Sequence, residues 1–169
     1  RSNLTEFLYS LPDVFDEQFP NRANAFQFDT DTRNIFICAD SKRLLSAFLE
    51  LLSNAAEADN SCGSIQIHSH VNACGHTVTV SVTGKGSLSE INPSEMQTNP
   101  LIDADAPLTA QLSTPFFSTK ENHAGLGLSI VAQVCHTHHA GFELYSRNGF
   151  TTAGITFPIL AMDDMRNTI

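Results

Sequence analysis

Basic residues are scarce in this sequence. Lys and Arg number 9 against 18 Asp and Glu, so the formal net charge is −9. A broad nucleic-acid-binding face needs clustered basic residues, and this balance argues against one. The same balance is compatible with a phosphate ligand, because one lysine, a helix end and a metal ion can suffice to bind it.

Closely spaced cysteines are also lacking. Cys38, Cys62, Cys74 and Cys135 show no C-x-x-C spacing, which argues against a zinc ribbon or a thioredoxin-like redox centre. An even count permits disulfides, but a chain of 169 residues that is 41% hydrophobic does not need them. We therefore expect reduced cysteines, mostly with packing roles, in a cytoplasmic protein.

No apolar run approaches the roughly 20 residues that span a bilayer. The start, Arg1 to Leu4, enters directly into a mixed amphipathic segment and does not resemble a signal peptide. We expect the chain to be cut from a longer protein and to make no membrane contact itself.

Hydrophobic periodicity predicts three helices and six strands in a single domain over residues 1–169. The first helix is expected to stop near Pro12, and Asp40 or Ser41 to cap the second. The predicted helices cover 4–11, 41–58 and 125–138, and the predicted strands 25–30, 34–40, 64–71, 76–84, 141–149 and 151–160.

Most of these strands follow one another closely enough to pair as antiparallel neighbours. The pattern predicts an α+β fold, a two-layer sandwich with about three helices on one face of a mixed, mostly antiparallel sheet. Regular βαβ alternation and the G-x-x-x-x-G-K-[ST] motif are both absent, which argues against a Rossmann or P-loop fold.

One polar pair stands out on the predicted helix 41–58. Glu50 and Asn54 lie four residues apart and share a face beside the apolar stripe. An amide oxygen can ligate Mg²⁺, and a carboxylate one turn away can orient a hydroxyl group or water. Taken alone, the pair is more typical of the polar face of an amphipathic helix than of a functional site.

A long aperiodic segment precedes the last helix. Residues 85–113 carry three prolines and few apolar anchors, and loops of this length are usually functional or disordered. They lead into "TPFFSTKENHAGLGLSIV" (114–131), where two glycines lie at the N-terminus of the predicted helix. Such a stretch is typical of a phosphate-binding loop, and also of a plain turn before a core helix.

Four segments in this order resemble the ATP-binding catalytic domain of sensor histidine kinases, of the nitrogen-regulatory type, in the superfamily shared with DNA gyrase. "CADSKRLLSAFLELLSNAAEA" is similar to the family's N box, and "TPFFSTK" to its F box. "AGLGLSIVAQVCHTHHAGFELYS" resembles the second glycine box with the helix and strand that follow, and "AGITFPIL" the closing strand. The resemblance covers nearly the whole chain and implies a Bergerat ATP-binding fold, with an ATP lid at 85–124 and a linker and first helix at 1–20.

The resemblance implies specific roles. Asn54 would chelate the Mg²⁺ that bridges the phosphates of ATP, and Glu50 would help to activate the phosphate acceptor. Lys120 would place a cation near the terminal phosphate, in a catalytic role. The remaining positions that the resemblance assigns to nucleotide binding are Gly84, Gly86, Thr119, Gly125, Leu126, Gly127 and Leu128.

The first glycine box departs from the family pattern. Gly84 stands where the family has an aspartate that accepts a hydrogen bond from the adenine amino group, and Leu88 stands where it has a second glycine. Gly86 alone matches. Losing a charged acceptor of this kind costs on the order of 1.5–3 kcal/mol of binding.

Three functions follow from these observations. The first is the catalytic domain of a histidine kinase, which would pass the γ-phosphoryl group of ATP to a histidine on a helical dimerisation domain outside this chain, and from there to the receiver domain of a response regulator. The second is a docking module that keeps the fold but binds nucleotide weakly or not at all, as Gly84 suggests. The third, an ATPase clamp of the gyrase or MutL type, is favoured only by Glu50.

Overall fold

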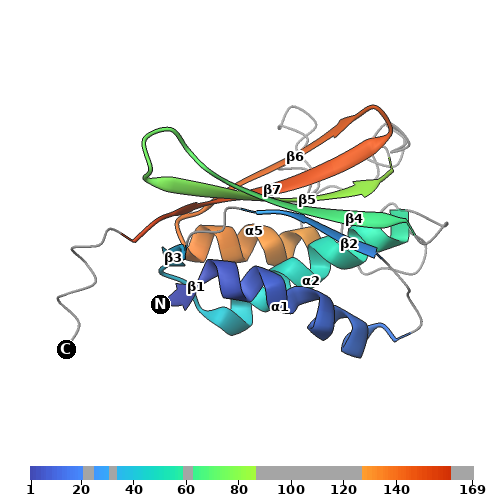
Figure 1. The fold of residues 1–169 in the computed structure, drawn as a ribbon, viewed down its shortest axis with the longest axis horizontal. Coiled ribbons are helices and arrows are strands. Elements are labelled where there is room, and N and C mark those ends of the chain that lie inside the picture. Colours follow the sequence, from blue (N-terminus) through green and yellow to red (C-terminus); the bar gives the residue numbers. More distant parts are fainter. Residues whose placement is uncertain (21–24, 31–33, 59–62, 87–126, 161–169) are drawn as a thin grey trace, which may run out of the picture.

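The computed structural model describes residues 1–20, 25–30, 34–58, 63–86 and 127–160, and these form a sheet layer and a helix layer (Figure 1). Its elements are β1 (Ser2–Asn3), α1 (Leu4–Gln18), β2 (Ala25–Asp29), β3 (Phe36–Ile37), α2 (Ser41–Ala58), β4 (Ser64–Val71), β5 (Thr77–Lys85), α5 (Gly127–Thr137), β6 (Gly141–Arg147) and β7 (Phe150–Pro158).

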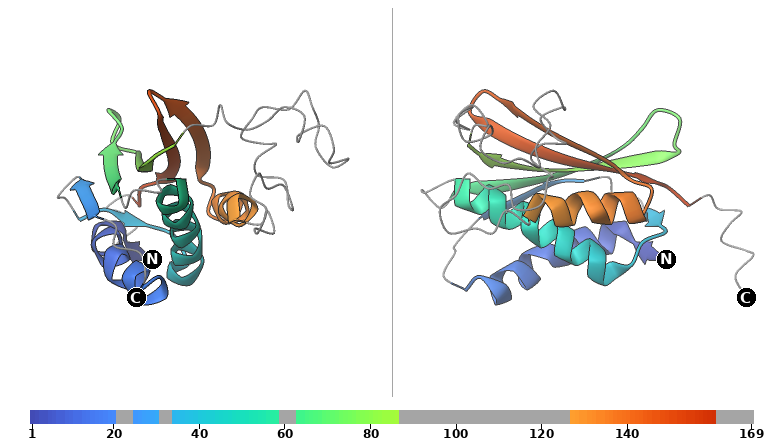
Figure 2. Two further views of the ribbon diagram at one scale, coloured as in Figure 1. Left: turned by 90° about the vertical axis from the view of Figure 1, so that its right-hand side faces the viewer. Right: turned by 180° about the vertical axis from the view of Figure 1, so that it is seen from behind.

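The main sheet has five strands in the order β2-β4-β5-β7-β6. Strand β2 pairs with β4 in parallel, and the other three pairs are antiparallel. Helices α1, α2 and α5 all lie on one face of this sheet, as the further views in Figure 2 show. The predicted α+β sandwich with a mixed sheet and three covering helices is confirmed.

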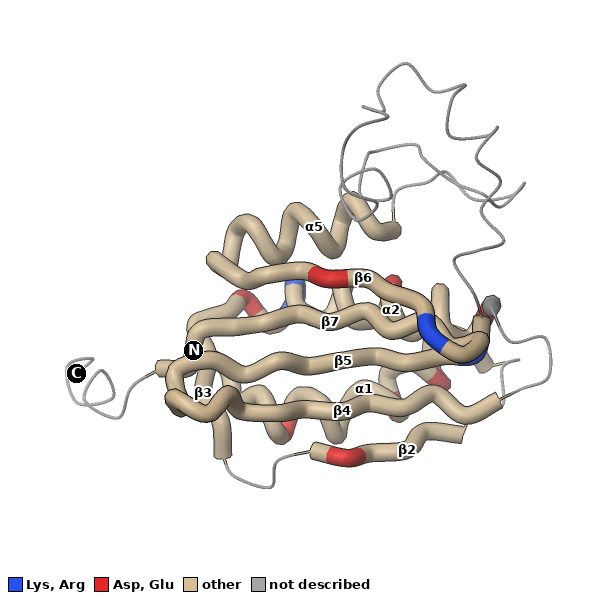
Figure 3. Tube along the Cα trace, turned by 90° about the horizontal axis from the view of Figure 1, so that it is seen from above, with Lys and Arg blue, Asp and Glu red and all other residues tan. Residues whose placement is uncertain are grey.

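The core lies between the sheet and the helices. Along β5 the side chains alternate, so that Val78, Val80 and Val82 are buried on the helix side. From the other layer, α2 buries Phe48 and Leu52, which are one turn apart. The strands of the main sheet contain few charged residues, as Figure 3 shows.

The first helix is longer than predicted. It was expected to stop near Pro12, but α1 runs through this proline to Gln18. Proline removes one N–H donor from a helix interior and weakens the helix there. Leu11 and Phe15 are fully buried on either side of Pro12, and their burial holds the helix together across the proline.

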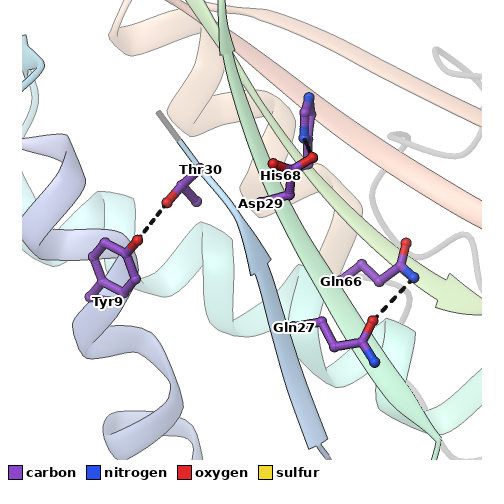
Figure 4. A network of polar contacts seen from close by, with 6 residues as sticks. All are labelled: Tyr9, Gln27, Asp29, Thr30, Gln66 and His68. Carbon is purple, nitrogen blue, oxygen red and sulfur yellow. Dashed lines mark hydrogen bonds and ion pairs between the residues drawn. The ribbon is translucent and has the colours of Figure 1, made fainter. Parts of the chain in front are cut away.

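The two short strands that follow α1 are not partners, contrary to their prediction as two joined strands. Strand β3 instead pairs with β1, a strand that was not predicted, to form a separate two-stranded sheet. Strand β2 becomes the edge of the main sheet, and Asp29 and Gln27 hydrogen-bond to His68 and Gln66 of β4 (Figure 4). Parallel pairing with a strand some forty residues away is not visible in local periodicity.

Strand β3 covers only two residues of the predicted strand 34–40, and the predicted start of the last helix at 125 lies outside the described residues, while, apart from α1, the other described boundaries agree with the predictions to within two residues. Helix α2 begins after Asp40, whose Oδ1 accepts the N–H groups of Lys42 and Arg43 as an N-cap. The β6–β7 hairpin turns at Asn148 and Gly149, whose φ angles of 55° and 77° suit an Asn-Gly turn.

The cysteines differ from the expectation of packing roles. Cys38 and Cys74 are exposed, and Cys62 lies outside the described residues. Cys135 is buried in α5, and burial raises the pKa of its thiol to about 11. Of the three described cysteines, only this one has a packing role.

Within the described ranges, no helix combines the length and apolar character that a membrane-spanning segment needs.

Candidate functional site

Helix α5 begins directly against the polar face of α2. A Cβ atom added to Gly127, the first residue of α5, would lie 2.6 Å from Glu50 Oε2 and 3.7 Å from Asn54 Nδ2. A side chain at this position would force the Glu50 carboxylate to move, whereas its contact with Asn54 would be an ordinary one. The structure thus brings together three residues that the sequence predicted as functional.

The side chains of Glu50 and Asn54 have no hydrogen-bond partner among the residues that the structure describes. Both are partly exposed, while Leu51 and Leu52 between them are buried. The buried leucines fix the rotation of α2 about its axis and so direct the polar pair toward the start of α5. A carboxylate and an amide oxygen held in this way are the hard oxygen donors that Mg²⁺ prefers.

The start of α5 adds a third element to this junction. The first N–H groups of a helix have no partner inside it, and the helix dipole makes this end favourable for anions. Leu128 follows Gly127 and packs against the core with its partly buried side chain, which anchors the first turn. An anionic ligand bound here would meet backbone donors on one side and the Glu50–Asn54 face on the other.

The glycines of β5 lie at the same end of the sheet. Gly84 pairs with Thr151 of β7, and an added Cβ atom there would lie 2.7 Å from the Cβ atom of Ala55, the residue after Asn54. Gly86 has a φ angle of 149°, which suits glycine, and its N–H donates to the carbonyl of Gly149. Gly84 thus packs against α2, and Gly86 is bonded to the β6–β7 hairpin.

Several predicted site residues lie outside the described residues, namely Thr119, Lys120, Gly125 and Leu126, together with Leu88. The predicted lid at 85–124 is described only at its start. There, Lys85 is the last residue of β5, and Gly86 is tied to the β6–β7 hairpin.

Two residues near the site were not predicted as part of it. Ala55 lies so close to Gly84 that no side chain fits at position 84 without a shift. Thr151 donates a hydrogen bond to the carbonyl of Gly86, at 3.0 Å, and thereby fastens the end of β5. The small residues after Asn54, in "NAAEA", are the signal that could have indicated Ala55, whereas Thr151 depends on the β5–β7 register.

The other end of the α2–α5 pair holds a cavity of about 460 Å³, lined by residues that include Asp40 and His138 and by none of the predicted site residues. His138 Nε2 accepts the N–H of Asp40 at 3.0 Å, and its Nδ1 lies 2.7 Å from the carbonyl of Val134. Because Nε2 accepts a hydrogen bond, the Nδ1 nitrogen carries the proton and donates it to that carbonyl. Among the described residues no group of three or more His, Cys, Asp or Glu side chains could hold a metal ion.

Comparison with known families identifies this architecture. Residues 39–161 match the family described as histidine kinase-, DNA gyrase B-, and HSP90-like ATPase. The chain belongs to this family. Within it, the chain is the ATP-binding catalytic domain of a two-component sensor histidine kinase, as its relatives and solved structures agree.

Among the relatives, the sensory histidine kinase/phosphatase NtrB of Rhizobium leguminosarum bv. phaseoli is 33% identical over 127 residues, which are 72% of this chain and 32% of NtrB. The sensor histidine kinase ZraS of Escherichia coli K12 is 28% identical over 123 residues, which are 73% of this chain and 22% of ZraS. This chain therefore spans about a third or less of the length of these relatives.

Among the solved structures, the catalytic domain of the histidine kinase ThkA superposes with a TM-score of 0.70 at 27% identity, covering 93% of both chains. A second ThkA structure, in complex with the response regulator protein TrrA, gives a TM-score of 0.68 at 26% identity and covers 94% of this chain and 41% of that chain. The family to which the chain belongs implies ATP binding.

Proposed function

We propose that this domain binds ATP together with Mg²⁺ where helix α5 begins against helix α2. The observation that carries the proposal is the approach of Gly127 to Glu50 and Asn54, two polar side chains with no described partner. Phosphate groups bound there would meet the positive end of the α5 dipole.

Each predicted residue has a role in this proposal. The amide oxygen of Asn54 holds Mg²⁺, which neutralises phosphate charge when it is bound. Glu50 orients the group that accepts the phosphoryl group, and Lys120 faces the terminal phosphate. Backbone groups of Gly84, Gly86, Thr119, Gly125, Leu126, Gly127 and Leu128 line the nucleotide.

The proposed reaction transfers the γ-phosphoryl group of ATP to an imidazole nitrogen of a histidine, leaving ADP. The acceptor histidine belongs to a helical dimerisation domain that this chain does not contain, and the group then passes to the receiver domain of a response regulator. A complex of ThkA with the response regulator TrrA supports the last partner. Chemistry of this kind depends on positioning and charge neutralisation, so few reactive side chains are needed, and the proposal places the domain in the cytoplasm.

Calorimetric titration with ATP and Mg²⁺ tests the binding step. The wild-type domain should release heat with a dissociation constant from micromolar to sub-millimolar, and Asn54→Ala should weaken binding by about tenfold or more. Ser46→Ala, an exposed position on the same helix, is the matched control and should bind like the wild type. No heat at millimolar ATP from a folded domain would overturn the proposal.

A second candidate function is a docking module that retains the fold without useful nucleotide binding. The observation that favours it is Gly84, which offers no side-chain acceptor where the family has an aspartate. Transfer of labelled γ-phosphate to a histidine-bearing dimerisation domain supplied in trans distinguishes the two functions. Transfer supports the kinase, and binding of the dimerisation domain without any transfer supports the docking module.

A further inference from the structure

Two histidines of β4 project from the outer face of the main sheet, the face that the helices do not cover. His68 and His70 alternate along the strand with the buried Ile67 and Ser69, so both rings lie on the side away from the core. Their ring centroids are 6.4 Å apart, and the ring planes are inclined by only 11°. The strand therefore presents two neighbouring imidazole rings to solvent.

The carboxylate of Asp29 determines which nitrogen of His68 carries its proton. Asp29 is paired with His68 in the parallel β2–β4 register, and its Oδ2 lies 3.1 Å from His68 Nδ1 (Figure 4). A carboxylate accepts hydrogen bonds, so Nδ1 donates and the lone pair of the neutral ring lies on Nε2. Histidines that bind metal ions usually have their second nitrogen held by a carboxylate or a carbonyl in this way. The side chain of His68 is 48% exposed, so a ligand can reach the ring.

His70 is exposed and has no hydrogen-bond partner among the described residues. The β2–β4 ladder ends at the pair of Asp29 and His68, so β2 pairs with no residue at position 70. On the other side, His70 is paired with Thr79, whose hydroxyl group bonds to that of Thr156. No hydrogen bond within the described chain therefore fixes the His70 ring, and one of its nitrogens can turn toward His68.

The charge and spacing of the pair suit a cation. Strands β2 and β4 contain no lysine or arginine, and Asp29 adds a carboxylate beside His68 (Figure 3). Zn²⁺ binds imidazole nitrogen at about 2.0–2.1 Å, which places the centroids of two rings on one tetrahedral ion about 5 Å apart. The rings can close the difference from 6.4 Å by small rotations, because exposed side chains change rotamer readily.

We infer that His68 and His70 form a site for a divalent transition-metal ion of the class that prefers imidazole ligands, such as Zn²⁺. Each histidine supplies one nitrogen, Asp29 orients His68 without binding the ion, and water molecules complete the coordination. A site with two protein ligands is consistent with the lack of any larger metal-binding group of His, Cys, Asp or Glu in the described ranges. The inference does not rest on the proposed function, because the site lies on the other face of the sheet from the helices.

A titration of the ¹⁵N-labelled domain with ZnCl₂, followed by nuclear magnetic resonance, locates the bound ion. The amide signals of His68 and His70, and of their ladder partners Ser81 and Thr79, should shift together and saturate below about 1 mM Zn²⁺. Mg²⁺ at the same concentration should leave them in place, because it prefers oxygen ligands. Signals that stay in place up to millimolar Zn²⁺ in the folded domain would overturn the inference and would not affect the proposed nucleotide site.

Variants of the two histidines test whether both rings bind the same ion. His68→Gln and His70→Gln should each raise the Zn²⁺ dissociation constant of this site by about tenfold or more. The double variant should bind within about twofold of the weaker single variant, since either change alone already breaks the chelate. His76→Gln, exposed in the turn of the same hairpin, is the matched control and should bind like the wild type. Weakening by only one of the two single variants would indicate a contact with one histidine and contradict the shared site.

Asp29 is a positioning residue in this site, and two variants test that role. Asp29→Ala removes the acceptor of His68 Nδ1 and should weaken Zn²⁺ binding by about tenfold. Asp29→Asn keeps a side-chain oxygen that can accept the same N–H, so most of the affinity should return. Both variants should melt like the wild type without metal, because the Asp29 side chain is 90% exposed. Unchanged Zn²⁺ affinity in Asp29→Ala would contradict the orienting role of this carboxylate.

Discussion

The two ends of the α2–α5 helix pair differ in how their polar groups are used. At the closed end, where α2 begins and α5 stops, His138 bonds to Asp40 and Val134 through both ring nitrogens. At the open end, Glu50 and Asn54 meet the start of α5 without a described hydrogen-bond partner. Glu50 and Asn54 are partly exposed, so their polar atoms are open to solvent and to a ligand. The closed end therefore contributes hydrogen bonds that stabilise the fold, whereas the open end has polar side chains that can contact a ligand.

The largest effect is expected at the open end, from Glu50→Gln in the longer protein. Loss of the carboxylate that orients the acceptor should slow phosphoryl transfer about a hundredfold, while the melting temperature changes little. Autophosphorylation with labelled ATP measures the rate, and thermal melting of the isolated domain provides the stability. A rate within about twofold of the wild type would assign Glu50 a purely structural role.

A large effect on stability is expected from Gly84→Ala. Its Cβ atom would meet the backbone of Ala55, so the free energy of unfolding should fall by about 1–3 kcal/mol. Urea denaturation measures it. The matched control is Gly127→Ala, whose Cβ atom would meet only the end of the Glu50 side chain, which can rotate aside. A change below about 1 kcal/mol is expected there, and equal losses in both variants would contradict the distinction between the two glycines.

At the closed end, His138→Ala should lower the free energy of unfolding by about 1–2 kcal/mol, because two hydrogen bonds are lost. Affinity for ATP should not change, since the two ends are separated by the length of α5. Denaturation and calorimetry on the same preparation test both halves of this expectation. His136→Ala, at an exposed neighbouring position, is the control and should leave both quantities unchanged. Weakened nucleotide binding in His138→Ala alone would show that the ends are coupled.

The smallest effect concerns pH. The N–H group of Arg43, followed by that of Lys42, holds the pKa of the Asp40 carboxyl below its usual value of 3.8. A carboxylate with a lowered pKa stabilises the fold fully at pH values above 3.8, and this contribution disappears as the pH falls through the folded-state pKa. The melting temperature of the wild type should therefore exceed that of Asp40→Asn near neutral pH by a small margin that closes in acid. If the difference between the two melting temperatures grew in acid, the Asp40 carboxylate would not stabilise the start of α2.

Local patterns in the sequence predicted most of the fold. The helical spacing of Leu44, Phe48 and Leu52 predicted α2. The alternation of apolar and polar residues predicted both strands of the β4–β5 hairpin. The failures involved long-range information. Strand β2 pairs in parallel across the intervening α2, and β3 pairs with β1 near the start of the chain, neither of which a periodicity can indicate. The predicted end of the first helix near Pro12 was wrong, because the burial of Phe15 that extends the helix cannot be known from local sequence.

The candidate site was predictable to a similar degree. Helical spacing placed Glu50 and Asn54 on one face, and the resemblance to histidine kinases singled out Gly127, which the structure brings beside them. The approach of Gly84 to Ala55 was not predictable, because it depends on how deeply α2 packs onto β5. The reason why position 84 has no side chain could therefore be seen only from the packing of α2 against β5.

The closed end is also where the described chain enters and leaves the domain. Ser2 pairs with Ile37, and the N–H of Leu160 donates to the carbonyl of Phe36, so the two ends of the described chain lie side by side. The open end lies beyond them by the length of α5, which has 11 residues and measures about 16 Å. With the site this far from the paired ends, a rigid rotation of about 15° about those ends would move the site through about 4 Å without changing its internal geometry.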